Sequence, residues 1–164
     1  MKENEEIIYR FFNKIIGLKA ENVMKGYGTF ICIDFGKKIK EQFKLWGKWR
    51  IDIRGEWHLW TMGLWKIYKK NSLIACCEDT DEKIEKALEK MDNKKLTNVE
   101  LLNNAYDLRL EFDNSINLYL FSTSAYNGDE ASIWILFTPE YKTLSAGSGA
   151  LLEYEDSGET PLKE

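Results

Sequence analysis

His58 is the only histidine in the chain, and its side chain is the one best suited to acid–base chemistry near neutral pH. Glu56 precedes it by two positions. Residues i and i+2 of a strand point to the same side, so this carboxylate would orient the imidazole for general-base catalysis. One interpretation is a small hydrolase or transferase that uses His58 with Glu56, Cys76 or Cys77. The other is a half-buried histidine with satisfied hydrogen bonds, which the lack of a nucleophile motif favours.

Motifs of established catalytic or metal-binding spacing are absent from the sequence. It contains no Gly-x-Ser-x-Gly, no phosphate-binding loop and no His-Glu-x-x-His. The three cysteines are Cys32, Cys76 and Cys77, an odd number with two adjacent, which fits neither a disulfide framework nor a zinc site. We therefore expect no cofactor, no metal and free buried thiols, as in a reducing cytoplasm.

Tryptophan is concentrated around His58, because five of the six tryptophans lie between residues 46 and 65. Such rings either fill a core or form the centre of a binding surface. Strand alternation sends these rings to both sides of a sheet, and a single sheet of this size buries only one side well. We therefore predict a binding face drawn from Trp46, Trp49, Arg50, Arg54, Glu56, Trp57, His58, Trp60 and Trp65. Burial of all five rings in the monomer core is the alternative.

Length, composition and charge indicate one globular domain. The chain has 164 residues, of which 44% are hydrophobic, and its net charge is −4. No basic block stands out, so nucleic acid is not the expected partner, and an acidic surface favours a basic protein. The charged N-terminus is not a signal peptide and no apolar run would span a bilayer, so we expect a cytoplasmic protein without membrane contact.

Two amphipathic helices are predicted from apolar residues that repeat at helical spacing. The first covers residues 3–16, with Gly17 placed to end it. The second covers residues 79–95, where Asp79 and Glu82 have the spacing of a capping box. Its apolar side consists of Ile84, Ala87, Leu88 and Met91.

Alternating apolar and polar residues predict strands before and after the second helix, with Gly47-Lys48 as one hairpin turn. The fold class is therefore α+β: a largely antiparallel sheet or sheets, with an N-terminal helix and one central helix between two β-meander halves. We expect a single domain over residues 1–152 and an acidic, flexible tail over residues 153–164.

Segments from both halves of the chain together carry a resemblance. They are Gly26-Tyr27-Gly28-Thr29-Phe30, Asp34-Phe35-Gly36, Gly55-Glu56-Trp57-His58-Leu59-Trp60, Trp65-Lys66-Ile67, Asp107-Leu108-Arg109-Leu110-Glu111-Phe112-Asp113 and Trp134-Ile135-Leu136-Phe137-Thr138-Pro139. These segments resemble an uncharacterised family of small bacterial proteins. The resemblance implies an α+β fold, and no activity or functional residue comes with it. Some small acidic bacterial proteins of this build are immunity proteins that inhibit secreted toxins, and that link is an analogy.

The sequence thus favours a non-catalytic, cytoplasmic protein-binding module that acts through a tryptophan-rich face, with an immunity-type inhibitor as one form of it. A homodimer interface is a second use of the same face. A small-ligand-binding protein and a small hydrolase that uses His58 are the alternatives from other classes.

Overall fold

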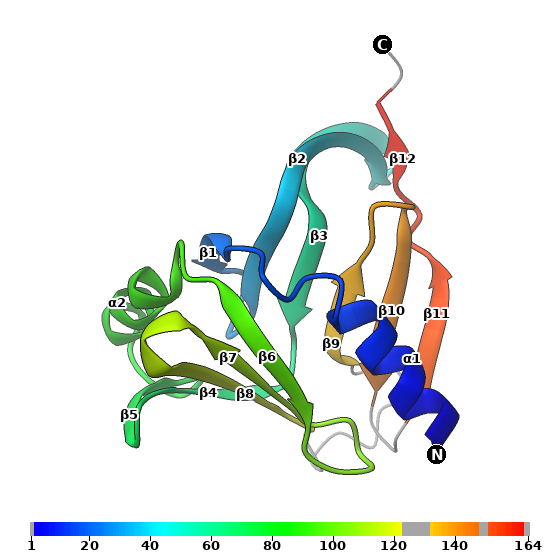
Figure 1. Ribbon diagram of the computed structural model, residues 1–164. Coiled ribbons are helices and arrows are strands. Elements are labelled where there is room, and N and C mark those ends of the chain that lie inside the picture. The colour runs from blue at the N-terminus through cyan, green and yellow to red at the C-terminus, as the bar shows by residue number, and fades with distance from the viewer. Residues whose placement is uncertain (1, 123–131, 148–150, 163–164) are drawn as a thin grey trace.

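The computed structural model describes residues 2–122, 132–147 and 151–162 (Figure 1). It contains two α-helices and antiparallel strands, the α+β class that the change between helical and strand periods predicts. The elements are α1 (Lys2–Phe12), β1 (Glu21–Lys25), β2 (Ile31–Leu45), β3 (Lys48–Thr61), β4 (Leu64–Lys69), β5 (Ser72–Cys76), α2 (Asp81–Met91), β6 (Leu96–Leu101), β7 (Leu108–Phe112), β8 (Ile116–Phe121), β9 (Ser132–Phe137), β10 (Lys142–Gly147), β11 (Leu151–Asp156) and β12 (Thr160–Pro161).

The strands form two sheets. A seven-stranded sheet has the order β1-β2-β3-β9-β10-β11, with β12 paired to β2, and a five-stranded sheet has the order β5-β4-β8-β7-β6. The first sheet takes strands from both ends of the chain and the second takes strands from the middle. The two halves expected from the sequence are therefore interleaved, because the chain leaves the first sheet after β3 and returns to it at β9.

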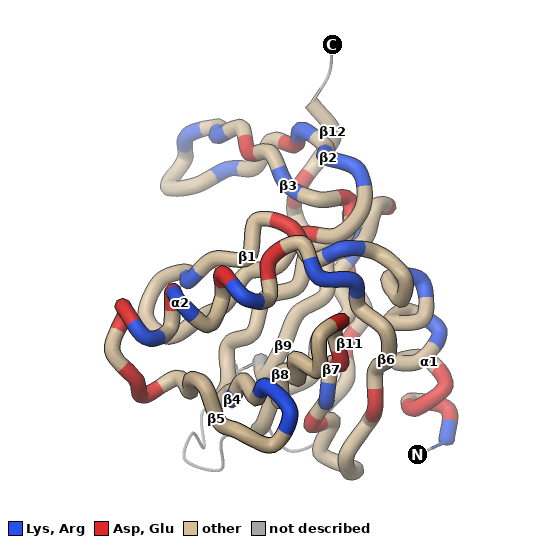
Figure 2. The backbone as a smooth tube through the Cα atoms, turned by 60° about the vertical axis from the view of Figure 1, so that its left-hand side comes forward, with Lys and Arg blue, Asp and Glu red and all other residues tan. Residues whose placement is uncertain are grey.

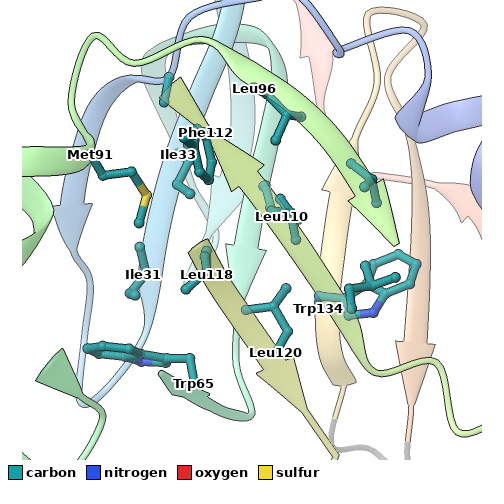
Figure 3. Close-up of a cluster of buried hydrophobic side chains, with 14 of the residues drawn as sticks. Ile31, Ile33, Trp65, Met91, Leu96, Leu110, Phe112, Leu118, Leu120 and Trp134 are labelled. Carbon is teal, nitrogen blue, oxygen red and sulfur yellow. The ribbon is translucent and has the colours of Figure 1, made fainter. Parts of the chain in front are cut away.

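The hydrophobic core lies between the two sheets (Figure 3). Alternate residues of β2, β3 and β9 point inward, and they meet the inward side chains of β4, β7 and β8. Two tryptophans, Trp65 on β4 and Trp134 on β9, are fully buried there. Each indole N–H donates to a backbone carbonyl, of Thr29 and Tyr106 respectively, so neither ring leaves a polar atom unpaired.

The predicted N-terminal helix exists as α1, and it lies across β9, β10 and β11 (Figure 1). Phe12 packs edge-on against Trp134, with ring centroids 5.2 Å apart. The helix ends at Phe12, four residues before the predicted end. Its apolar stripe nevertheless continues through the following turn, where Ile15 is fully buried, and Gly17 follows with a positive φ of 91°.

The predicted central helix exists as α2, beside β1 and β5, and its four predicted apolar residues are buried. Its N-cap is Thr80 rather than Asp79, since the Thr80 hydroxyl accepts a hydrogen bond from the Lys83 amide. Asp79 instead accepts a hydrogen bond from the Cys76 amide. The Asp79 carboxylate therefore stabilises the turn that follows β5 and does not cap α2. No helix in the described part of the chain is long and apolar enough to cross a membrane.

The segment expected as a flexible tail contributes two strands. β11 pairs with β10 over its whole length, and β12 pairs with β2, so the boundary after residue 152 falls inside a strand. The acidic residues Glu153 and Glu155 alternate with Leu152 and Tyr154, and Leu152 packs against the core. An edge strand with one solvated face has the same acidic composition as a tail, and composition alone does not separate the two.

Candidate functional site

The distal half of the β2–β3 hairpin, residues 37–54, projects from the body of the molecule, and we call it the arm (Figures 1 and 2). Among the strands that the structure describes, β2 and β3 are the longest, with 15 and 14 residues. Their neighbour β9 pairs with β3 only from His58 to Thr61. The turn is Trp46-Gly47, one residue earlier than predicted, and both φ angles are positive, 49° and 75°, as a type I′ turn requires.

Two glycines allow the arm to bend away at its base, where the β2–β3 register shifts between Phe35 and Lys38. A Cβ atom on Gly55 would lie 2.8 Å from the backbone nitrogen and oxygen of Phe35. Gly36 has a φ of 81°, and a Cβ atom there would lie 2.6 Å from Glu56 Oε1. The bulge therefore depends on the absence of side chains at both positions.

Arg54 joins the arm to the body through a buried cluster of charged groups. Its Nε donates to Glu41 Oε2 at 2.8 Å and lies 3.6 Å from Glu159 Oε2. Nη1 donates to the Gly55 carbonyl at 2.8 Å, and Nη2 donates to the Thr138 carbonyl at 3.3 Å. The guanidinium is used within the fold, so its role is to fix the arm rather than to contact a partner.

Glu159 brings a second carboxylate to this cluster, just before β12 pairs with β2. Burial, followed by the neighbouring Glu41 carboxylate, raises the pKa of Glu159 to about 8, although the positive charge of Arg54 acts in the opposite direction. Glu159 therefore carries its proton at neutral pH. This neutral form avoids placing two buried negative charges beside one guanidinium.

One face of the arm carries a row of exposed apolar side chains. The exposed fractions are 63% for Trp49, 65% for Ile51 and 54% for Ile53, and Trp46 at the turn is 90% exposed. Across the hairpin from the three β3 residues lie Lys44, Gln42 and Lys40 of β2, in that order. An apolar strand and a basic strand thus lie side by side on one surface.

The arm also differs from the body in charge, and Figure 2 shows basic residues along it. It contains seven Lys or Arg and two Asp or Glu, a formal charge of +5. The whole chain carries −4, so the residues outside the arm carry −9. The net charge therefore does not describe the surface on which the exposed tryptophans lie.

The outer edge of β3 in the arm has no partner strand among the described residues, because pairing with β9 begins at His58. In a two-residue hairpin the residues flanking the turn exchange backbone hydrogen bonds, so the amides and carbonyls of Trp49, Ile51 and Ile53 point away from β2. The Asp52 carboxylate accepts a hydrogen bond from the outward Ile53 amide at 2.9 Å. On the opposite edge, the outward Lys40 carbonyl accepts a hydrogen bond from Leu162.

The residues predicted to form one tryptophan-rich face lie in three places. Trp46, Trp49 and Arg50 are exposed on the arm, and Arg54 is buried at its base. Trp57 and Trp65 are buried in the core, and Glu56, His58 and Trp60 are half-buried. The outward-facing aliphatic residues Ile51 and Ile53 were not singled out by the sequence, although they alternate with Arg50 and Asp52.

His58 pairs with Asp34, its cross-strand neighbour on β2, rather than with Glu56. The Trp60 indole N–H donates to Nε2, so the imidazole proton lies on Nδ1 and is donated to the Asp34 carboxylate. Burial raises the pKa of Asp34, but hydrogen bonds from His58 and Asn22 outweigh it, and the net effect is a lowered pKa. Both imidazole nitrogens are engaged, which leaves no lone pair for a substrate proton.

The cysteines do not complete a Cys–His pair. Cys76 and Cys77 lie in and directly after β5, whereas His58 lies on β3 of the other sheet. Cys32 lies opposite Trp60, and burial, together with the charge of Asp34, raises the pKa of its thiol to about 11. A thiol with this pKa is protonated at neutral pH and is a poor nucleophile. No group of three metal-ligating side chains occurs in the described ranges.

Comparisons of the chain with protein-family models, with curated proteins and with solved structures found no match.

Proposed function

We propose that the protein is a non-catalytic binding module whose arm contacts a partner protein with an acidic surface. The observation that carries the proposal is the exposed row of Trp49, Ile51 and Ile53 on a segment of charge +5. Aromatic and aliphatic anchors beside basic residues have the composition of an interface centre and its rim. The basic residues would attract an acidic surface and accelerate encounter with it.

The aliphatic members of the row favour protein over nucleic acid. Trp46 and Trp49 beside lysines would suit base stacking and phosphate contacts. Ile51 and Ile53 offer no flat surface for a base, and removing them from water requires an apolar partner surface. Both isoleucines are more than half exposed, so a partner that covers the row must cover them as well as the tryptophans.

The backbone edge of the arm favours protein over lipid. The outward amides and carbonyls of Trp49 and Ile51 would lose their water in a hydrocarbon layer, and each unpaired group costs several kcal/mol there. A partner strand satisfies the same groups by hydrogen bonding, which is the principle of strand addition. The arm thus combines an apolar row with the backbone groups that a protein strand recognises.

The contacts of His58 do not support the hydrolase alternative, since both ring nitrogens are hydrogen-bonded, one to Asp34 and the other to Trp60. An inhibitor of a toxin, the analogy drawn from small bacterial immunity proteins, is one form that the proposed binding takes. Because the arm is positively charged, we expect the surface that it recognises on such a toxin to be acidic. This reverses the charge expected from the composition of the whole chain.

The proposal is tested by site-specific photo-crosslinking in cells of the source organism. A photoreactive residue at position 46 reports on the arm, and one at position 27 is the matched control, because Tyr27 is also aromatic and 93% exposed but lies outside the arm. We expect an adduct with a different protein from position 46 only. Equal adducts from both positions, or none from position 46, would contradict the proposal.

The captured protein is then purified and its affinity is measured directly. We expect Trp49→Ala with Ile51→Ala to weaken binding about tenfold or more, whereas Leu73→Ala, an exposed apolar residue outside the arm, has no effect. Lys40→Glu with Lys44→Glu should weaken binding and reduce its salt dependence. Unchanged affinity in both arm variants contradicts the proposed surface.

A further inference from the structure

The free edge of the arm has a self-complementary sequence. Residues 49–53 read Trp-Arg-Ile-Asp-Ile, with apolar side chains at both ends and in the centre. The basic Arg50 and the acidic Asp52 lie at equal distances from Ile51. A strand with this symmetry matches a second copy of itself when the two run antiparallel about Ile51.

We infer that two copies of the protein associate through this edge, with β3 of each arm pairing antiparallel to β3 of the other about a twofold axis at Ile51. In that register Ile51 faces the partner's Ile51, and Trp49 faces the partner's Ile53. Arg50 faces the partner's Asp52, and the same ion pair recurs on the other side of the axis. Each contact is reciprocal, as an isologous twofold interface requires.

The backbone supports the same register. The outward amides and carbonyls belong to Trp49, Ile51 and Ile53, and antiparallel pairing about Ile51 sets these residues opposite one another as hydrogen-bonded pairs. The Ile53 amide, which Asp52 caps in the single chain, would donate instead to the carbonyl of the partner's Trp49. The Asp52 carboxylate is then free to accept from the partner's Arg50.

The positive charge of the arms does not prevent this pairing. Lys48 would face the partner's Arg54, whose charge is compensated by the buried Glu41 carboxylate. Lys40 and Lys44 lie on β2. Three strand spacings, about 14 Å, therefore separate them from the lysines on the partner's β2. That separation exceeds the Debye length of about 8 Å at physiological salt.

The pairing would also widen the apolar surface that the proposed function uses, and this part of the inference rests on that function. The second copy then pairs with the free backbone edge, and the other partner contacts the apolar rows and the lysines. The two apolar rows become neighbours in the centre of one sheet, and Lys40 and Lys44 of each copy lie on the β2 strands that flank the two central β3 strands. An apolar centre with a charged rim is the usual anatomy of a protein interface. Strand edges alone bury little area, so the dimer is expected to be weak and concentration-dependent.

Disulfide trapping tests the register. In a hydrogen-bonded antiparallel pair the Cα atoms are about 5.5 Å apart, which suits a disulfide, so Ile51→Cys should form a covalent dimer under mild oxidation. Trp49→Cys is the matched control on the same row. Its counterpart lies four residues along the strand, about 13 Å away, and we expect no dimer. Failure of Ile51→Cys to cross-link, or equal cross-linking of both variants, overturns the inference.

Charge reversal tests the ion pairs without changing the core, because Arg50 and Asp52 are exposed. Arg50→Asp and Asp52→Arg should each weaken dimerisation about tenfold in sedimentation velocity, since each creates like-charge pairs across the axis. The double variant should restore it, and equal melting temperatures would show that all variants fold. A double variant as weak as the singles, or a wild type that stays monomeric at millimolar concentration, overturns the inference. Neither outcome affects the cross-linking of position 46 to a different protein, which tests the proposed function separately.

Discussion

The two halves of the β2–β3 hairpin share their strands and their pairing but differ in what covers them. In the proximal half, Ile33 faces Leu59 and both side chains are fully buried against the second sheet. In the arm, Ile51 and Ile53 have the same alternation and lie in solvent. Alternation determines which residues share a face, whereas only the packing of other elements determines whether that face is covered.

The difference separates two uses of the same residue types. Apolar residues of the proximal half stabilise the monomer, because folding removes them from water. The apolar residues of the arm gain little from folding, so their benefit comes when another surface covers them. Alanine substitutions in the proximal half should therefore lower the stability more than those in the arm. Substitutions in the arm should weaken binding to a partner more than those in the proximal half.

The largest expected effect compares one aliphatic residue from each half. Leu59→Ala should lower the free energy of unfolding by about 3 kcal/mol, because it leaves a cavity between the sheets. Ile51→Ala should lower it by less than about 0.5 kcal/mol, since the side chain is already hydrated. Urea denaturation of both variants at low protein concentration measures the difference. Similar losses at the two sites would show that the arm is covered in the folded monomer.

The second-largest loss of stability is expected at the junction between the two halves. Gly55→Ala should cost about 2 kcal/mol, because the added Cβ would overlap the Phe35 backbone and the bulge must rearrange. Gly26→Ala is the control, since its Cβ would make ordinary contacts with Cys32 and Phe30. Chemical denaturation again provides the readout. If the two alanine variants were equally stable, the arm would not depend on a close strand approach at its base.

Sequence patterns anticipated much of the fold and part of the site for identifiable reasons. Helical spacing of Ile84 and Leu88 located α2, because side chains three and four residues apart share a helix face. The density of tryptophan predicts an exposed face within residues 46–65, and Trp46 and Trp49, two of the five tryptophans there, are exposed. Both inferences use short-range information, which periodicity and composition carry well.

The features that sequence reasoning missed depend on contacts between distant strands. Spacing along one strand predicts Glu56 as the partner of His58, whereas the β2–β3 register places Asp34 there. The pairing of β12 with β2 joins residues 160 and 42, and composition carries no sign of it. The charge of the arm was hidden in the net charge, because acidic residues elsewhere outweigh it. Register and local charge become visible only once the strands are placed.

A smaller effect is expected from the polar pair in the proximal half. Asp34 has a lowered pKa in the fold, so its contribution to stability is present above its usual pKa of 3.8 and is lost as the pH falls through the folded value. Asp34→Asn should cost about 1–2 kcal/mol at neutral pH and should reduce the acid dependence of unfolding. Thermal unfolding between about pH 7 and pH 3 measures both. If the variant lost as much stability as the wild type on acidification, Asp34 would not be the source of that loss.

The base of the arm should respond to pH in the opposite direction. Glu159 faces Glu41 on β2, and Asp52 and Arg54 on β3, and its pKa is raised from 4.5 to about 8. The folded state thus holds a proton that the unfolded chain releases. The contribution of Glu159 to stability is full below about pH 4.5 and declines as the pH rises toward 8.

Glu159→Gln keeps the neutral form at every pH. The variant should therefore match the wild type below about pH 4.5 and become increasingly the more stable of the two as the pH rises toward about 8. Glu155→Gln, an exposed position on β11, is the control and should leave the profile unchanged. The Leu162 amide donates to the Lys40 carbonyl at 3.3 Å. At alkaline pH its hydrogen should exchange with solvent faster in the wild type than in Glu159→Gln, because an ionised Glu159 repels Glu41 and loosens β12 from the arm. Parallel pH profiles for wild type and Glu159→Gln would mean that the proton is not held at the base of the arm. The two halves of the hairpin would then share one pH response, and the charged cluster would no longer distinguish the arm from the sheet it extends.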